Sequence, residues 1–480
     1  MDIRTETDIE RLRTVTQLQV SWIEQLTRQL ELKCREIDTL RGTDGDFQST
    51  LSLVESGVEP TPAPESAPPP PDSSPRKPRD RVGPTEQPGL EEETLRFELD
   101  EPDKTCPACG GELRAFEGQF DRSELIDVCE VKYKLVKVEQ QKYICRCGGC
   151  VETAPGPLRL VDGGRYSLAF GAKVVADKYV HHIPLARQVR MMRDHGLTIT
   201  SQTLWDQIRA AAELLRPSWQ AIRHHILRQP VIGLDQTGWP SLHDKRRKPW
   251  QMWCLTAPDA IFHDIREDKS AATFVELVGD FEGTIVCDAL GTHPAGARAS
   301  PGRIELAGCW AHVKRKFDEA VPSNPEAAIA LKHISALYVA ECEARDDIER
   351  ARVRQSASVE VLEELKRWLM SRSTLRKSAF GRAVRYTLVN WNRLTRFVDD
   401  PRVPLDNNAT ERALRGPVVG RRNHFGSKSR RGTEAAAVLY SLAETAKLHR
   451  VAPRRYFEAA LQRARVEPRA VVLPWEAARG

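Results

Sequence analysis

The sequence predicts an α/β protein whose mixed β-sheet core is interrupted by an all-helical insertion. Three observations support this fold class. Short apolar stretches of strand type recur between residues 230 and 310, with one helical stretch, Ala271–Val278, among them. Two of these stretches end in an aspartate, Asp235 and Asp288. A long and highly charged helical region then follows over residues 313–398.

Length and composition limit the protein to a few broad classes. A chain of 480 residues with 40% apolar residues has room for two or three domains and a sizeable core. The formal net charge of +5 is a mild basic excess. No apolar run approaches the length of a membrane span, and the N-terminal stretch MDIRTETDIERL lacks the apolar segment of a signal peptide. We therefore expect a cytoplasmic protein without a membrane partner.

The N-terminal part is predicted to hold a self-association helix and a linker. Residues 1–48 place apolar side chains in an a/d register with no Pro or Gly before Gly42, which favours a short coiled coil and hence a homo-oligomer. One long amphipathic helix that packs on its own chain is the alternative. Residues 49–98 are rich in Pro, Ser and charge, so we expect them to remain disordered.

The cysteines of residues 99–160 have the spacing of a zinc ribbon. A Cys-x-x-Cys-Gly-Gly knuckle precedes an alternating, strand-type segment at 128–143, and a second cysteine cluster follows that segment. Four thiolates complete a tetrahedral site, so we predict one structural Zn²⁺ with no open coordination position. Four ligands are needed, and the spacing favours Cys147 with Cys150 as the second pair. The candidate ligands are Cys106, Cys109, Cys145, Cys147 and Cys150.

Residues 161–228 have the outline of a helical DNA-binding region of the helix-turn-helix type. We expect a short helix over 183–195, a turn that begins at Gly196, and a second helix that runs from a capping Ser201 to Leu215. Any pair of packed helices gives a similar pattern, so simple packing is the alternative.

The strand order expected in residues 229–435 describes a ribonuclease-H-like core. Three antiparallel-type strands, a helix and further strands make up this mixed α/β architecture. One aspartate then lies on the first strand and one on the fourth, where Asp235 and Asp288 fall. Residues 436–480 are expected to form a C-terminal helix and tail. The expected strands are 231–235, 250–256, 260–266, 283–288 and 303–309.

Asp235, Asp288 and Glu411 are the candidate ligands of hard cations. A carboxylate at the end of a buried strand is costly to desolvate, so it needs a cation or strong hydrogen bonds. Glu411 lies on a helix predicted in PLDNNATERALRG, which Asp406 or Asn407 would cap. Taken alone, this stretch is better interpreted as an ordinary surface helix that carries a Glu–Arg pair, and only the two upstream aspartates favour a site. Together, the three carboxylates suit one or two Mg²⁺ ions.

Basic and polar residues surround these carboxylates in the chain. His312 closes the sequence Cys309-Trp-Ala-His312 at a predicted strand end, where it can assist a metal site, position a phosphate or hold the strand. Zinc binding by this pair is discounted, because no second pair stands nearby. Residues 421–431 hold five positive charges and no acid, which suits contact with a phosphate backbone, although a solvated basic loop has the same composition. The candidate DNA-binding residues are Lys314, Arg315, Asn408, Arg415, Arg421, Arg422, Lys428, Arg430 and Arg431.

The order of these motifs resembles the bacterial insertion-sequence transposases of the sixty-six family. The resemblance covers nearly the whole chain, and its most specific motifs are CWAHVKRKF and NNATERALR followed by GRRNHFGS. It implies a DDE transposase with Asp235, Asp288 and Glu411 as the catalytic triad and His312 as a further catalytic candidate. The chain departs from the family at Gln236, where Glu is usual, and in the segment that follows Asp288.

The resemblance also implies a reaction and its partners. The enzyme would cut the ends of its insertion sequence and join the freed 3′-hydroxyls to target DNA, using two Mg²⁺ ions, or Mn²⁺ in their place. Its partners would be the terminal repeats, the target DNA and accessory proteins encoded by the same element, which indicates a nucleoid-associated protein. Two alternatives stay open: a ribonuclease-H-like nuclease that only cleaves, and a catalytically decayed transposase that still binds DNA.

Overall fold

The computed structural model describes residues 133–144, 151–242, 249–289 and 291–477. All of them belong to one compact unit, residues 123–480. The coiled coil expected over 1–48 and the linker over 49–98 lie outside the described residues. So do all five candidate zinc ligands, Cys106, Cys109, Cys145, Cys147 and Cys150. These parts of the sequence analysis remain predictions.

A short antiparallel hairpin opens the described part of the chain. Strand β1 (Lys142–Ile144) pairs with β2 (Val151–Thr153). The strand predicted over 128–143 is wrong for residues 133–141, which form no strand. The side chains of Leu135, Val136 and Val138 face solvent, with Leu135 at 80% exposure, because an alternating pattern forms a strand only where a neighbouring strand or a core accepts it.

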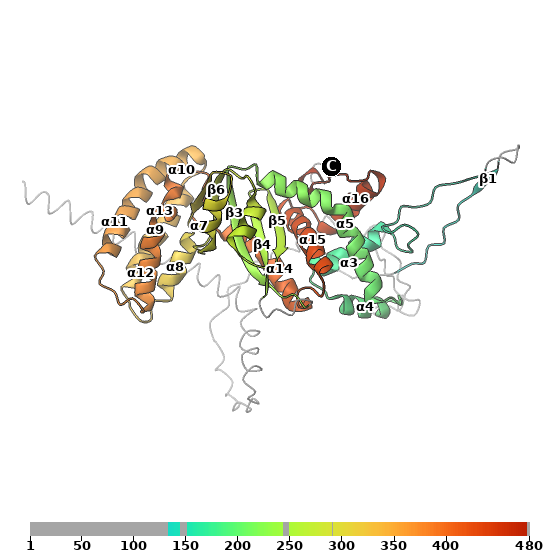
Figure 1. The fold of residues 1–480 in the computed structure, drawn as a ribbon, viewed down its shortest axis with the longest axis horizontal. Coiled ribbons are helices and arrows are strands. Elements are labelled where there is room, and N and C mark those ends of the chain that lie inside the picture. The colour runs from blue at the N-terminus through green and yellow to red at the C-terminus, as the bar shows by residue number, and fades with distance from the viewer. Residues whose placement is uncertain (1–132, 145–150, 243–248, 290, 478–480) are drawn as a thin grey trace, which may run out of the picture. The chain divides into compact units, whose positions relative to one another are not determined.

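Five strands form one mixed sheet at the centre of the fold (Figure 1), in the order β5-β4-β3-β6-β7. The first three strands along the chain are antiparallel neighbours, and β6 and β7 run parallel to β3. The mixed sheet is confirmed, and its order and directions fit the ribonuclease-H-like core. The strands are β3 (Val231–Trp239), β4 (Trp250–Ala257), β5 (Ala260–Arg266), β6 (Gly283–Val286) and β7 (Ile304–Ala307).

The strand bounds differ from the expectation at both aspartates. β3 continues four residues beyond Asp235, because Gln236 to Trp239 pair with the first residues of β4. β6 ends at Val286, two residues before Asp288. The helix between β5 and β6, α6 (Ala271–Val278), has the predicted bounds, and the side chain of Ser270 caps its first turn.

Helix α15 (Arg430–Leu448) covers the free edge of the sheet at β5. The hydroxyls of Ser441 and Thr445, one helical turn apart, accept the backbone N–H groups of His263 at 2.7 Å and Ile261 at 3.1 Å. An edge strand otherwise presents unpaired backbone groups, so these side chains complete the sheet. The domain boundary expected at residue 435 therefore falls inside a helix of the core.

Four further helices pack beside this edge. α3 (Leu168–Tyr179) and α16 (Pro453–Val466) lie against α5 (Ser201–Ile226), which itself contacts β5. α4 (Leu185–Asp194) and α5 reproduce the predicted helix pair, but α5 runs eleven residues beyond Leu215 and is capped by Thr200 rather than Ser201. The apolar face of α5 is buried along its length. Recognition of a DNA groove by the α4–α5 pair stays a prediction. The described part of the chain ends with the short helix α17 (Pro474–Ala477).

The helical insertion has a hydrophobic cluster of its own on the β6–β7 side of the sheet (Figure 1). The cluster includes Trp310, Phe317 and Trp391. Among the described residues, no helix is long and apolar enough to span a membrane. The helices of this side are α7 (Thr292–Ala299), α8 (Trp310–Asp318), α9 (Ala327–Glu343), α10 (Asp347–Val353), a π-helical turn (Arg354–Ser358), α11 (Val359–Met370), α12 (Ala379–Val389), α13 (Trp391–Leu394) and a 3-10 turn (Arg396–Val398).

Candidate catalytic site

Two neighbouring parallel strands bring Asp235 and Asp288 to the same level of the sheet. Gly233 of β3 lies beside Val286 of β6 in the parallel ladder, and each aspartate follows its member of this pair by two residues. Asp235 remains within β3, opposite Cys254 of β4, whereas Asp288 follows the end of β6. The register of the sheet therefore places the two carboxylates side by side, although the segments that carry them are far apart in the chain.

The start of helix α14 (Asn408–His424) carries Glu411 to the same place. Asn407 donates from Nδ2 to the carbonyl oxygen of Leu234 at 2.9 Å, and the hydroxyl of Thr410 lies 2.7 Å from that of Thr256 on β4. This close approach needs a glycine beneath it, because a Cβ on Gly233 would lie 2.1 Å from the Thr410 hydroxyl. The helix start is thus held against the strand that carries Asp235.

Of the two predicted capping residues of α14, Asp406 makes the side-chain bond to the helix start and Asn407 does not. Asp406 accepts the backbone N–H of Asn408 at 3.0 Å, whereas Asn407 makes no side-chain cap bond. Asp406 also accepts the hydroxyl of Tyr338 on α9 at 2.8 Å, which ties the insertion to this helix start. The sequence DNNATER therefore combines a cap, a tie to the sheet and the candidate ligand Glu411 within one turn.

Asp235 is the carboxylate whose pKa the surroundings change most clearly. Burial raises the pKa of Asp235 to about 7, and the charges of Asp288 and Glu411 act in the same direction. The backbone N–H of Gln236, which donates to Oδ1 of Asp235 at 2.7 Å, opposes this rise in pKa. The Oε1 atom of Glu411 is buried and has no hydrogen-bond partner among the described residues. Such a cluster of partly buried oxygens fits a hard divalent cation.

The raised pKa of Asp235 predicts a stability effect that depends on pH. Above pH 7 the metal-free protein holds an ionised carboxylate at a cost, and this cost disappears as the pH falls below 7 and the group is protonated. Asp235→Asn should therefore stabilise the metal-free protein by about 1–2 kcal/mol at pH 8, less than the full linkage value because the side chain is partly exposed. Thermal unfolding in the presence of a chelator measures this difference, and at pH 5 it should fall to about a third or less.

Cys309 and His312 open a helix instead of ending a strand, which corrects the expectation. β7 stops at Ala307, and Cys309 is the N-cap residue of α8. The Nδ1 atom of His312 lies 3.6 Å from Oε1 of Glu411, and Arg315, one turn further along, lies 3.8 Å from Oε2. The structure thus brings His312 and Arg315 to the candidate ligand Glu411.

His293 is a buried residue beside the site that the sequence analysis missed. It lies on α7 and is fully buried, with Nε2 3.0 Å from Oε1 of Gln236 and Nδ1 3.4 Å from Oδ1 of Asp288. Burial lowers the pKa of His293, although the charge of Asp288 opposes this effect. Its position five residues after Asp288 was the only signal in the sequence. The imidazole links Gln236, which follows the first aspartate, to the second aspartate, Asp288.

We expect His293 to act as a positioning residue. His293→Leu removes the link to Gln236 and Asp288 and should lower the rate constant for strand cleavage by about 10–100-fold, the usual cost of losing a hydrogen-bond partner behind a ligand. The DNA concentration that gives half the maximal rate should change less than threefold. His293→Gln, which keeps one polar contact, should recover part of the rate. An unchanged rate constant in His293→Leu would contradict this role.

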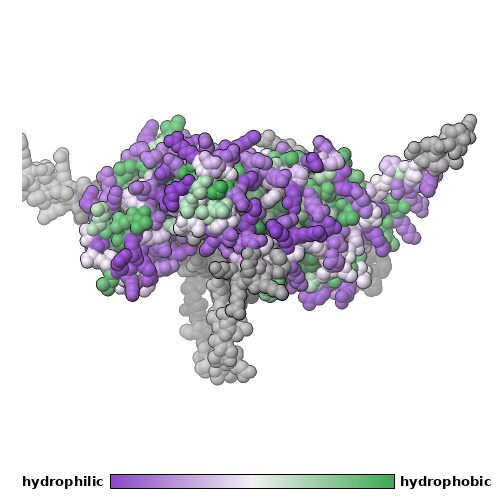
Figure 2. Space-filling view, viewed as in Figure 1, coloured by the Kyte–Doolittle hydropathy of each residue, from purple (hydrophilic) through white to green (hydrophobic). Residues whose placement is uncertain are grey.

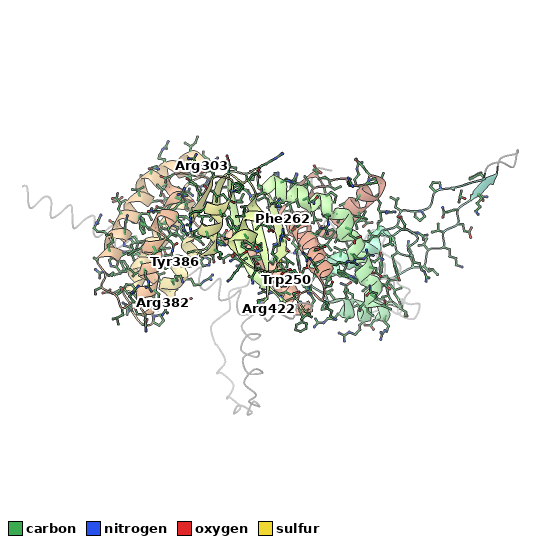
Figure 3. All side chains as sticks on the ribbon, in the orientation of Figure 1. Trp250, Phe262, Arg303, Arg382, Tyr386 and Arg422 are labelled. Atoms are coloured by element: carbon green, nitrogen blue, oxygen red, sulfur yellow. The ribbon has the colours of Figure 1, made fainter. Side chains whose placement is uncertain are left out.

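The insertion also reaches the site through Tyr386 on α12, which Figure 3 labels. The tyrosine interacts with the backbone N–H of Ala289, directly after Asp288, and burial raises its pKa to about 12. The ammonium of Lys316 lies 4.6 Å from the centre of its ring. This contact was not predicted, because nothing in the sequence of α12 marks one tyrosine for it.

The candidate DNA-binding residues fall into two groups. Lys314, Arg315 and Asn408 line an open depression of about 360 Å³ between α8 and the start of α14, next to Glu411. Arg415 is exposed further along α14. The second group lies where α14 ends and α15 begins and consists of Arg421, Arg422, Lys428, Arg430 and Arg431.

Four residues of the second group lie on helix ends and Lys428 lies in the turn between the helices, so the alternative of a solvated basic loop is wrong for most of this stretch. Arg421 and Arg422 belong to the last turn of α14, and Arg430 and Arg431 to the first turn of α15. The turn between them is held by Trp239, whose indole N–H donates to the hydroxyl of Ser427 at 3.1 Å. Arg421 donates to the hydroxyl of Thr237 at 2.9 Å, so its first role is to tie α14 to β3. Figure 3 labels Arg422 at this end of the helix, and Figure 2 shows that hydrophilic side chains dominate the visible face.

The region that contains these residues matches a known protein family. The model of the transposase IS66 family matches residues 163–435, more than half of the chain. The chain belongs to this family. Membership of the IS66 family supports a transposase function and implies a DNA-processing enzyme that uses divalent metal. The matched region contains all three candidate carboxylates of this IS66 family member.

Curated relatives of this IS66 family member occur in Sinorhizobium fredii. It is 29% identical to the uncharacterized protein y4jD over 401 residues, which cover 78% of each chain. It is 28% identical to the uncharacterized protein y4hP over 410 residues, which cover 78% of this chain and 74% of the relative. Neither name states an activity, so these relatives add no functional detail.

Proposed function

We propose that the protein is a DNA transposase that cuts the ends of its insertion sequence and joins the 3′-hydroxyls to target DNA. The observation that carries this proposal is the meeting of Asp235, Asp288 and Glu411, which come from β3, the end of β6 and α14. The charges of Asp288 and Glu411 both raise the pKa of Asp235, which supports one site shared by the three carboxylates. Membership of a transposase family supports the same reading.

The three carboxylates would hold two Mg²⁺ ions, or Mn²⁺ in their place. Bound metal supplies positive charge that stabilises the transferring phosphoryl group. The protein contributes the geometry: the β3–β6 register sets the two aspartates, and the bonds of Asn407 and Thr410 to the sheet set Glu411. His293 and Tyr386 hold the segments beside the aspartates.

The basic residues are proposed to bind the DNA in two places. The depression lined by Lys314, Arg315 and Asn408 lies beside Glu411 and suits the phosphate next to the bond that is cut. The exposed residues around Arg422 suit the backbone further along the duplex. The zinc ribbon and the α4–α5 pair would recognise the terminal repeats, the coiled coil would pair two ends, and accessory proteins of the element would assist.

The test is an assay of cleavage and strand joining. Purified full-length protein is incubated with Mg²⁺ and DNA that carries the element's own ends, with Asp235→Asn as the inactive comparison. We expect 3′-hydroxyl ends and joined products, both dependent on Mg²⁺ and absent from Asp235→Asn. Cleavage without joining would instead support a nuclease of the ribonuclease-H type. Specific binding of the ends without chemistry in Mg²⁺ or Mn²⁺, with accessory proteins present, would support a decayed transposase.

A further inference from the structure

Glu411 of the carboxylate site also belongs to a second cluster of potential metal ligands, together with Cys309 and His312. The ligand atoms of Cys309, His312 and Glu411 all lie within 4.8 Å of one another. Cys309 precedes the first turn of α8 and His312 follows it by three residues, so both lie on one face of that helix. Glu411 approaches the same point from the first turn of α14. The cluster is therefore built by two helix starts.

The chemistry of this cluster differs from that of the three carboxylates. A thiolate, an imidazole and a carboxylate are the ligands that Zn²⁺ and similar borderline cations take, whereas Mg²⁺ prefers oxygen alone. Tetrahedral zinc with these ligands separates the ligand atoms by about 3.3–3.7 Å. The 3.6 Å between Nδ1 of His312 and Oε1 of Glu411 already meets this requirement. The sulfur lies within 4.8 Å of both atoms, so small side-chain rotations close the site.

Two of the three ligand atoms lack any other partner. Nδ1 of His312 and Oε1 of Glu411 are both buried and accept or donate no hydrogen bond within the described residues. A buried polar atom without a partner is costly, and a shared cation would satisfy both. The sulfur of Cys309 accepts the backbone N–H of Asn407 at 3.3 Å, a contact that orients it and favours the thiolate when a metal is bound.

We propose that Cys309, His312 and Glu411 form a second metal site that takes zinc-class cations and leaves one coordination position open. Glu411 is common to this site and the carboxylate site, so a zinc ion here withdraws Glu411 from Asp235 and Asp288. Zinc bound here then inhibits DNA cleavage, and Mg²⁺ does not have this effect because it does not bind at the second site. The binding itself stands independently, and only the inhibition rests on the proposed function.

Metal content tests the binding. Full-length protein is stripped with a chelator, loaded with Zn²⁺, desalted and measured for zinc per chain. Cys309→Ser keeps the size of the side chain and the bond from Asn407 but removes the thiolate, and Cys342→Ser is the matched control at an exposed cysteine. We expect Cys309→Ser and His312→Gln each to hold one zinc fewer than the wild type and Cys342→Ser to hold the same number. Equal zinc in all four proteins would overturn the proposal.

Cobalt spectroscopy separates this site from the predicted zinc ribbon. Co²⁺ replaces Zn²⁺ and gives a charge-transfer band for each thiolate ligand. The wild-type spectrum minus the Cys309→Ser spectrum should show the absorption of one thiolate ligand. Cys106→Ser changes the predicted zinc ribbon instead, so adding Cys309→Ser to it should still remove the absorption of one thiolate. Circular dichroism of each variant identifies a loss of fold. A Cys309→Ser spectrum identical to that of the wild type would refute the site.

The regulatory consequence has its own readout. Cleavage in Mg²⁺ is measured over a range of Zn²⁺ concentrations, and each rate is divided by the same protein's rate without zinc. The zinc concentration for half inhibition should rise at least about tenfold in Cys309→Ser. Equal zinc sensitivity would contradict the shared role of Glu411. If no protein cleaves DNA under any condition, the proposed function fails, whereas the zinc count still decides the metal site.

Discussion

Glu411→Gln should lower the rate of strand cleavage by at least about 10³-fold, a loss of about 4 kcal/mol of transition-state stabilisation. The substitution keeps the size of the side chain and removes the charge that the third metal ligand must carry. Asn407 and Thr410, which hold the helix start against the sheet, are untouched, so α14 should keep its place. Single-turnover cleavage of end DNA measures the effect.

The matched control for Glu411→Gln is Glu467→Gln. Glu467 is an exposed glutamate at the end of α16 that pairs with Arg463 on the surface, so its replacement should change the cleavage rate less than about twofold. Binding of end DNA should be similar in both variants. A cleavage rate for Glu411→Gln within tenfold of the wild type would remove Glu411 from the catalytic set.

Arg354→Met should cost about 3–5 kcal/mol of folding free energy, the largest stability effect that we expect. Arg354 is 1% exposed inside the insertion. It contacts the carboxylate of Glu341 through two bonds of 2.5 and 2.8 Å and donates to the carbonyl of Phe397 at 2.6 Å. Methionine fills the space but leaves the largely buried Glu341 carboxylate with only the longer, 3.6 Å contact to Arg350, and a poorly compensated buried charge is the costly part of breaking such a pair.

Two controls identify the poorly compensated Glu341 charge as the cause. The double variant Arg354→Met with Glu341→Met removes both charges and should recover at least half of the lost stability. Arg350→Met removes a more exposed arginine near the same glutamate and should cost less than about 1 kcal/mol. Denaturant unfolding gives all three values. A double variant no more stable than Arg354→Met would show that packing, not charge, carries the effect.

The sheet was predictable because its strands are apolar stretches bounded by polar segments. Helix α6 and strand β5 have the predicted bounds. β3 was predicted too short, because Gln236, Thr237 and Gly238 look like a loop until β4 supplies backbone partners. The same limit applies to α14, whose basic last turn reads as a loop in the sequence but is held by Arg421 and Thr237.

The candidate site was predictable in residue type but not in its supporting contacts. Asp235, Asp288 and Glu411 follow from the pattern of strand ends and the helix motif. The His293–Gln236 contact joins residues 57 positions apart, and periodicity contains no information on such a pair. Cys309 and His312 were discounted as a metal site because a sequence search seeks a second Cys or His pair. Their third partner is Glu411, which only the fold brings close.

The central claim is that three carboxylates form one divalent-metal site, and Mn²⁺ binding measured by electron paramagnetic resonance tests it without any DNA. Each variant removes one ligand: Asp235→Asn, Asp288→Asn and Glu411→Gln. At pH 8 the wild type should bind Mn²⁺, and each variant should bind at least about tenfold more weakly. Below pH 7 the wild type should lose affinity as Asp235 takes up a proton. Mn²⁺ affinity unchanged in all three variants would contradict the account.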